Sequence, residues 1–288
     1  MRVFFSPNHI CHSPQTFISK GQIIKSPEQP ERANILENAA RTAGHTFIEA
    51  TQHGLKPIED IHDEGYINFL KTAWSLWEGT TDSGSEIIPN IHPGRNMHAK
   101  PNSIISLAGH YQADTACPIG KGTFEGSMAS SDVAVSGAYA IMDGKKNNIK
   151  SNFAYSLCRP PGHHAFSDQA GGFCFFNNSA IAAQTCLNNG AKKVAILDID
   201  VHHGNGTQGI FYDRADVLTI SLHGDPLSYY PFFAGYSEEI GVDEGVNCNI
   251  NYPLPQNTDD AEYLKVLDKA IDSIHIYQPD VLVIALGL

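Results

Sequence analysis

The chain has few cysteines, few basic residues and no long apolar run. Its 288 residues include six cysteines without any Cys-x-x-Cys spacing, which favours reduced thiols over a disulfide framework or a zinc knuckle. Lys and Arg number 19 against 31 acidic residues, a formal net charge of −12. Recognition of nucleic-acid phosphates, which depends on basic side chains, is therefore not expected, whereas a cationic substrate suits this charge.

Targeting and membrane signals are also missing. No window approaches the ~18 apolar residues of a membrane span, and Pro7 and His9 interrupt the N-terminus before a signal-peptide core can form. Hydrophobic residues make up 42% of the chain and charged residues 17%, which excludes a disordered chain. We expect a folded cytoplasmic protein with no membrane or nucleic-acid partner.

Apolar β-branched runs alternate with helical patterns along the whole chain, which predicts an α/β fold with a mostly parallel sheet covered on both faces. A single domain over residues 1–288, with three layers (α/β/α) around one central sheet, is the favoured organisation. The expected strands are 2–5, 153–158, 193–201, 217–222, 246–250 and 281–286, and the expected helices are 29–43, 66–77, 127–142, 178–189 and 259–277.

Residues 79–126 have little periodicity and much Gly, Pro, Asn and Ser. They are interpreted as a long surface excursion, and loops of this length are usually functional or mobile.

The segment 193–207 ends an apolar strand with acidic residues and histidines. In an extended chain, side chains alternate, so Asp198, Asp200 and His202 would point the same way. Two carboxylates and an imidazole at the carboxyl end of a strand favour a divalent metal such as zinc. The alternative is that the carboxylates cap a loop and the histidines lie on the surface.

A second histidine pair follows the strand expected at 153–158. Pro160, Pro161 and Gly162 impose an irregular turn that could present both His163 and His164, and histidine suits proton transfer near neutral pH. Taken alone, such a pair is more often an ordinary loop feature. The segment 171–178 adds two glycines and three phenylalanines, which could either wall an apolar channel or belong to the core.

These motifs resemble those of the zinc-dependent histone deacetylase and acetylpolyamine amidohydrolase superfamily, closest to the bacterial acetylpolyamine amidohydrolases. The matching segments occur in the expected order: Gln29-Pro-Glu-Arg, Ile61-His-Asp-Glu-Gly-Tyr, Arg159-Pro-Pro-Gly-His-His, Gly172-Phe-Cys, Asp198-Ile-Asp-Val-His-His-Gly-Asn-Gly-Thr and Ser221-Leu-His. The resemblance covers essentially the whole chain and implies an arginase/deacetylase-like fold.

The resemblance also implies roles for individual residues. Asp200 and His202 match two of three zinc ligands, with Fe²⁺ or Co²⁺ as alternatives to Zn²⁺. His164 matches the general base. Asn205 occupies the position at which the family has the residue that pairs with this second histidine. His163, paired with Asp198, matches a histidine that assists electrostatically.

Further matches concern the surroundings of the zinc. Asp198, Asp200, His202, Ser221 and Leu222 match a structural potassium site formed largely by backbone carbonyls. Phe173 and Tyr230 match the two aromatic walls of the acyl tunnel, and Gly172 adjoins the first. His62, His203 and His223 are left unassigned, because structural histidines are more common than ligands.

The chain departs from the family pattern at its last residues. The family's third zinc ligand is an Asp directly after the strand that here ends the sequence, so that ligand is expected just after Leu288. The tyrosine that stabilises the oxyanion lies further on in the family. We expect this chain to lack its C-terminal part.

The segment 79–126 resembles the dimer-forming loop of the bacterial acetylpolyamine amidohydrolases. By that analogy the protein forms a homodimer, and Asp114 and Glu125 could meet a distal ammonium group of the substrate. For each of these carboxylates, a solvated position on the loop is an equally good interpretation.

The first hypothesis for function is zinc-dependent release of acetate from acetylated polyamines or similar small acetylamines. The alternatives are a protein lysine deacetylase and an inactive module that binds acetylated ligands.

Overall fold

The computed structural model describes residues 1–147 and 152–287. The chain divides into two compact units, Met1–Asn178 and Ser179–Leu288, each of which is described by itself. Within the described ranges, no helix is both long enough and apolar enough to cross a membrane. All six cysteine side chains are free thiols.

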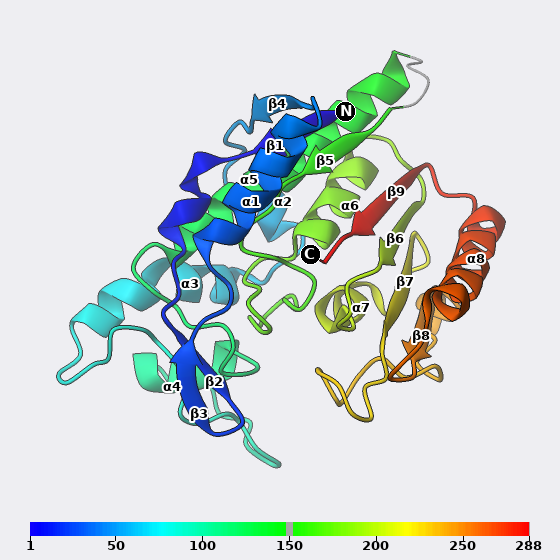
Figure 1. Cartoon of the computed structure of the whole chain (residues 1–288). Coiled ribbons are helices and arrows are strands. Elements are labelled where there is room, and N and C mark those ends of the chain that lie inside the picture. The colour runs from blue at the N-terminus through cyan, green and yellow to red at the C-terminus, as the bar shows by residue number, and fades with distance from the viewer. Residues whose placement is uncertain (148–151, 288) are drawn as a thin grey trace. The chain divides into compact units, whose positions relative to one another are not determined.

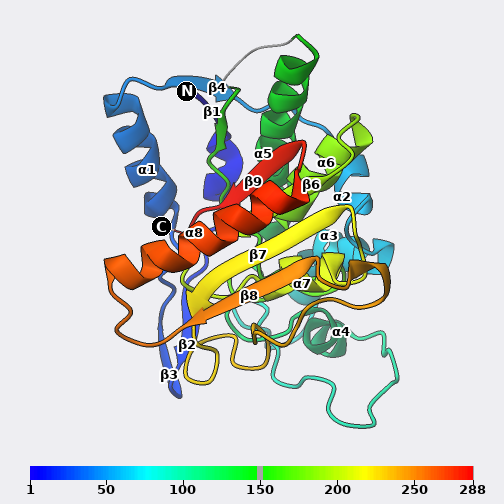
Figure 2. The ribbon, with the colours of Figure 1, turned by 90° about the vertical axis from the view of Figure 1, so that its right-hand side faces the viewer.

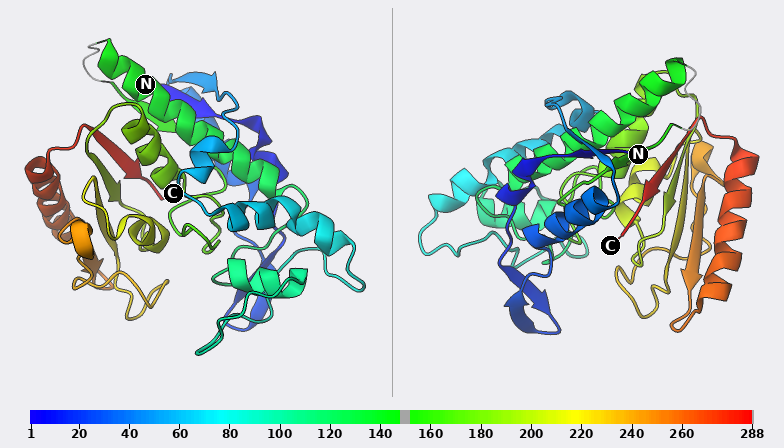
Figure 3. Two further views of the ribbon diagram at one scale, coloured as in Figure 1. Left: turned by 180° about the vertical axis from the view of Figure 1, so that it is seen from behind. Right: turned by 45° about the horizontal axis from the view of Figure 1, so that its top comes forward.

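The first unit is built on a three-stranded parallel sheet in the order β4-β1-β5, with β1 (Arg2–Phe5) between β4 (Thr46–Glu49) and β5 (Ala154–Ser156). A separate antiparallel hairpin joins β2 (Thr16–Ser19) to β3 (Gln22–Lys25). Figures 1 and 3 show this hairpin extending away from the sheet of its unit. The helical elements are η1 (Pro7–Cys11), α1 (Pro30–Thr42), α2 (Lys56–Glu59), α3 (Glu64–Glu78), α4 (Ile104–Tyr111) and α5 (Thr123–Lys146).

Helix α5 is the central helix of the first unit. Its small side chains are buried on nearly every side, as its composition predicts, and it contacts both β1 and β5. Tyr66 of α3 donates a 2.6 Å hydrogen bond from its hydroxyl to the carbonyl of Phe175, which ties the segment 171–178 to the same core.

The second unit contains a four-stranded, wholly parallel sheet in the order β8-β7-β6-β9. Its strands are β6 (Val194–Asp198), β7 (Val217–Gly224), β8 (Asn249–Leu254) and β9 (Val281–Ala285). Helix α6 (Asn178–Asn188) starts at the last residue of the first unit and is followed by α7 (Asn205–Phe211), η2 (Asp243–Gly245) and α8 (Asp260–Tyr277). Figure 2 shows α8 lying along β7 and β8, where Ala270 joins Leu218, Ile220 and Leu222 in one apolar cluster.

The predicted α/β class with mostly parallel strands is confirmed, and two of the predicted strands have wrong bounds. The strand expected at 193–201 ends at Asp198, because the chain bends directly after it. The strand expected at 246–250 lies at 249–254 instead, and as an edge strand it accommodates Pro253. The single-domain organisation stays a prediction.

Residues 79–126 contain some regular structure. This segment contains α4, which Ser103 caps by accepting a hydrogen bond from the N–H of Ser106. Ile87 and Ile119, both fully buried, form an antiparallel bridge within it. The segment is therefore fastened into its unit at several points, and its interpretation as a surface excursion stays a prediction.

The close approach of α4 to the chain at Ile91 provides a stability test. A Cβ at Gly109 would lie 1.8 Å from the carbonyl oxygen of Ile91. We expect Gly109→Ala to lower the free energy of unfolding by about 1–3 kcal/mol in urea denaturation. Gly79→Ala is the matched control, because the nearest atom lies 3.6 Å away, and should change stability by about 0.5 kcal/mol or less. Equal losses in the two variants would contradict the close approach.

Two fully buried histidines of the first unit predict a pH dependence of stability. Burial lowers the pKa of His62 to about 4 and that of His12 to about 3, from the ordinary value of 6.5. The unfolded chain therefore binds protons that the folded chain does not, so stability is lost as pH falls below 6.5.

Each of these histidines should remove about 1.4 kcal/mol of stability per pH unit in that window. Urea unfolding at pH 6.5 and pH 5 measures the loss. His62→Gln, which keeps an acceptor and cannot take up a proton, should show a shallower loss than wild type. An identical slope would show that His62 does not stay neutral in the folded state.

Candidate functional site

The histidine pair lies in an irregular turn of the first unit, after β5. Gly162 directly precedes it, and a Cβ there would lie 2.4 Å from the backbone nitrogen of Asn178, so only glycine fits. The rings of His163 and His164 are both buried, with centroids 3.9 Å apart and planes at 42°. The turn thus presents both imidazoles at one place, as the Pro-Pro-Gly sequence predicts.

Arg159 anchors the start of this turn. Its guanidinium donates to the Glu28 carboxylate at 2.9 Å, to the His9 carbonyl at 2.7 Å and to the Gln29 carbonyl at 3.1 Å. Arg159 and Glu28 are both buried, and burial raises the pKa of Glu28 and lowers that of Arg159 in spite of their pairing. Removing either partner would leave a buried charge without its counter-ion, which costs about 3–5 kcal/mol.

Two asparagines that follow the turn in sequence donate hydrogen bonds within the first unit. The side-chain amide of Asn178 donates to the carbonyl of Pro160 at 3.1 Å and to the hydroxyl of Ser130 at 3.0 Å. The backbone N–H of Asn177 donates to Nε2 of His62 at 2.9 Å. His62, which the sequence leaves unassigned, therefore acts here as a structural acceptor.

Phe173, a predicted tunnel wall, stands on a tight turn in the first unit. Its φ of +71° is rare for an aromatic residue, and the N–H of the preceding Gly172 donates to Asp114 at 3.0 Å. The Asp114 carboxylate also accepts from the N–H of Ala116 at 2.8 Å. Glu125 lies exposed in the first turn of α5. A substrate role for either carboxylate stays a prediction.

The acidic motif of the second unit begins where β6 ends. Asp198 accepts the N–H of Asp200 at 3.1 Å, and Asp200 accepts the N–H of His202 at 2.7 Å. The extended geometry expected for residues 198–202 is therefore wrong, because each carboxylate caps a bend in the chain. The side chains still converge, since Nδ1 of His202 lies 3.0 Å from Oδ1 of Asp200.

The Asp200 and His202 donors fit a zinc ion. Neighbouring donors in a tetrahedral site with bonds of roughly 2.0 Å lie roughly 3.3 Å apart, close to the separation seen here. In the part of the chain that the structure describes, no group of three or more His, Cys, Asp and Glu side chains is placed to hold a metal. Leu288 lies outside the described residues, and the third ligand expected after it stays a prediction.

Three of the residues expected at a potassium site, Asp198, Ser221 and Leu222, lie on neighbouring strands, whereas Asp200 and His202 lie in the bend after β6. Asp198 ends β6 and is the register partner of Ser221 in β7, which Leu222 follows. Nearby, the Ser221 hydroxyl and Nδ1 of His223 lie 2.8 Å apart, and the His203 and His223 rings pack at 4.6 Å. Both histidines are buried parts of the second unit.

Aromatic side chains surround His202. Its ring stacks on Tyr229 at 5.0 Å and meets Tyr230 edge-on at 5.9 Å. Tyr230 was predicted as a tunnel wall. Tyr229 directly precedes Tyr230 in the sequence, and no local pattern distinguishes the role of one from that of the other.

Asn205 is the first residue of α7, and its N–H donates to the carbonyl of His203 at 2.9 Å. The predicted pairs, His164 with Asn205 and His163 with Asp198, each join residues of different units. Both pairings stay predictions.

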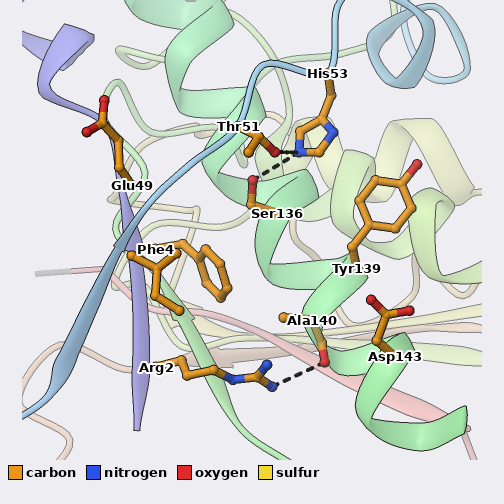
Figure 4. Close-up of a pocket in the computed structure, with 10 residues that line it drawn as sticks. Arg2, Phe4, Glu49, Thr51, His53, Ser136, Tyr139, Ala140 and Asp143 are labelled. Carbon is orange, nitrogen blue, oxygen red and sulfur yellow. Dashed lines mark hydrogen bonds between the residues drawn. The ribbon is translucent and has the colours of Figure 1, made fainter. Parts of the chain in front are cut away.

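A separate hollow of about 270 Å³ lies in the first unit, and it contains none of the predicted site residues. Figure 4 shows the His53 ring turned toward Thr51 and Ser136, while Arg2 donates to the carbonyl of Ala140. These groups satisfy one another, and the hollow offers no catalytic arrangement that the sequence predicts.

Comparison with known proteins places the chain in a family. Residues 26–288 match the histone deacetylase domain. The chain is 42% identical over 290 residues to acetylpolyamine amidohydrolase 2 of Pseudomonas aeruginosa, a match that covers 100% of this chain and 82% of that protein. It is 40% identical over 289 residues to acetylpolyamine amidohydrolase of Mycoplana ramosa, covering 100% and 83%.

Comparison with solved structures supports the same family. The crystal structure of acetylpolyamine aminohydrolase from Burkholderia pseudomallei matches with a TM-score of 0.94 and 40% identity, covering 100% of this chain and 82% of that one. By sequence and by fold, the chain belongs to the histone deacetylase family.

Proposed function

We propose that this protein hydrolyses the acetamide bond of acetylated polyamines or similar small acetylamines, releasing acetate and a free amine. The observation that carries the proposal is the identity of about 40% to acetylpolyamine amidohydrolases along the whole chain. The buried imidazole pair and the converging Asp200 and His202 donors supply groups suited to this reaction.

The histidine pair performs the proton transfers in this proposal. His164 acts as the general base that takes a proton from the attacking water and then delivers it to the leaving amine. His163 assists electrostatically, and burial of both rings excludes bulk water from the transfer. Asn205, a neutral partner, orients His164 with less stabilisation of its cation than a carboxylate would give, which keeps the base free.

Metal dependence is general in the family. In this chain Asp200 and His202 would hold the ion, Zn²⁺ or in its place Fe²⁺ or Co²⁺, and a structural K⁺ would bind the carbonyls near Asp198, Ser221 and Leu222. A bound zinc supplies Lewis-acid polarisation of the acetamide carbonyl. Phe173 and Tyr230 would line the acyl tunnel.

The remaining parts of the proposal concern the setting of the enzyme. A homodimer and a cytoplasmic location are proposed, the second because the six cysteines are free thiols. The net charge of −12 supports a cationic substrate and no nucleic-acid partner. Asp114 and Glu125 are retained as candidate contacts for a distal ammonium.

Activity is tested with N-acetylputrescine and an acetyl-lysine peptide, following acetate release. We expect preferential turnover of the small amine and a fall of about 100-fold or more in kcat for His164→Ala, because the base is lost. His275→Ala, an exposed histidine on α8, is the control and should behave as wild type. Robust activity on the peptide alone would favour a protein lysine deacetylase, and binding of both ligands without turnover would favour an inactive module.

Metal binding is tested by the zinc content of purified protein after dialysis against a zinc buffer. Asp200→Asn and His202→Ala should each weaken zinc affinity by at least about tenfold, because each removes a proposed ligand. Asp213→Asn, an exposed carboxylate in the same unit, serves as the matched control. Wild-type affinity in both ligand variants would refute the assignment whether or not the protein is active.

A further inference from the structure

The β2–β3 hairpin places an aromatic side chain against Phe173. The ring of Phe17 in β2 lies 5.5 Å from the ring of Phe173, with the planes at 52°. Side chains alternate along a strand, so the neighbouring Ile18 belongs to the opposite face. Phe17 is the only hairpin residue in the described structure with a ring contact to Phe173.

A buried carboxylate holds the hairpin directly before Phe17. Glu86, which is 8% exposed, accepts the N–H of Gln15 on Oε1 at 2.8 Å and the N–H of Thr16 on Oε2 at 2.9 Å. The next residue, Ile87, is fully buried and bridged to Ile119, so the position of the carboxylate is well defined. Bonds to an ionised acceptor are about twice as strong as neutral ones.

The same segment, 79–126, also holds the residue before Phe173. Asp114 accepts the N–H of Gly172 at 3.0 Å, and the N–H of Ala113 donates to the carbonyl of Ala170 at 2.7 Å. The residue directly before each phenylalanine therefore donates its backbone N–H to a carboxylate of the segment 79–126. Thr16, before Phe17, donates to Glu86, and Gly172, before Phe173, donates to Asp114. The segment 79–126 therefore fixes the backbone next to both Phe17 and Phe173.

The β2–β3 hairpin depends on the Glu86 hydrogen bonds for a fixed position. A two-stranded hairpin is marginally stable by itself, and the side chain of Ile23 near its turn is 77% exposed. Its base is closed by the N–H of Ser26 donating to the Gln15 carbonyl at 3.1 Å. Glu86 adds the two bonds that join this base to the segment 79–126.

We propose that Phe17 is a specificity-determining residue that narrows the acyl tunnel at Phe173, and that Glu86 is its positioning residue. This inference rests on the proposed deacetylase function, in which Phe173 lines the tunnel. A ring packed against that wall leaves room for a short acyl group and excludes longer ones. Hydrophobic pockets discriminate by about 10–200-fold for one methylene, so a single ring can set acyl preference.

The test compares kcat/KM for N-acetyl-, N-propionyl- and N-butyrylputrescine. We expect Phe17→Ala to raise the ratio of butyryl to acetyl turnover by about tenfold, with the larger change in KM. Glu86→Gln should shift the ratio in the same direction, because an amide offers one acceptor in place of two. Ile18→Ala should keep the wild-type ratio, and Glu86→Asp, which keeps two acceptors, should restore part of it. An active Phe17→Ala variant with the wild-type ratio would overturn the proposal.

Amide hydrogen exchange provides a readout that does not need turnover. In Glu86→Gln, exchange at Gln15 and Thr16 should accelerate by at least about tenfold, while the protection of α5 stays unchanged. Unchanged exchange at these two amides would overturn the positioning role. If the wild-type protein hydrolyses no acylputrescine, the proposed function is rejected, and the acyl-selecting role of Phe17 with it. Faster exchange at Gln15 and Thr16 in Glu86→Gln would still show that Glu86 positions Phe17.

Discussion

Carboxylates that accept hydrogen bonds from backbone N–H groups hold the irregular segments that carry the proposed site. Glu86 and Asp114 do so in the first unit, and Asp198 and Asp200 do so at the end of β6. These four hydrogen bonds are partly buried, so losing an acceptor would cost less than the about 1–3 kcal/mol of a fully buried N–H, but each bond still favours the observed course of its loop. The acidic excess of the sequence is therefore partly structural, and net charge alone overstates how much of it faces a substrate.

The regular part of the fold was largely predictable from the sequence. Strands β1, β6, β7 and β9 are apolar runs in parallel sheets, and such runs stand out without knowledge of their partners. Strands β6 and β7 are buried nearly throughout, whereas alternate residues of β9 are exposed. Helix α5 was recognised by its small side chains. The β2–β3 hairpin was not, because its strands are short and largely exposed, so burial leaves no pattern in them.

Of the candidate site, the described part of the structure shows only two local pairs, and the catalytic and metal-binding roles stay predictions. The His163-His164 turn and the Asp200 and His202 donors follow from local sequence, although the bend after Asp198 does not. The roles of Arg159 with Glu28 and of Glu86 with the hairpin join residues about 70 to 130 positions apart. Such contacts leave no periodic or local signal.

The bend after Asp198 has a consequence for metal exchange. Because the backbone N–H groups of Asp200 and His202 fix this bend, the donor atoms are aimed before any cation arrives. Ion binding as proposed at Asp200 and His202 would therefore not be coupled to folding, in contrast to a zinc finger, whose ligands assemble only around the metal. At the proposed site, one divalent ion would then replace another without unfolding of the chain, so the ion bound there would reflect metal supply as much as intrinsic preference.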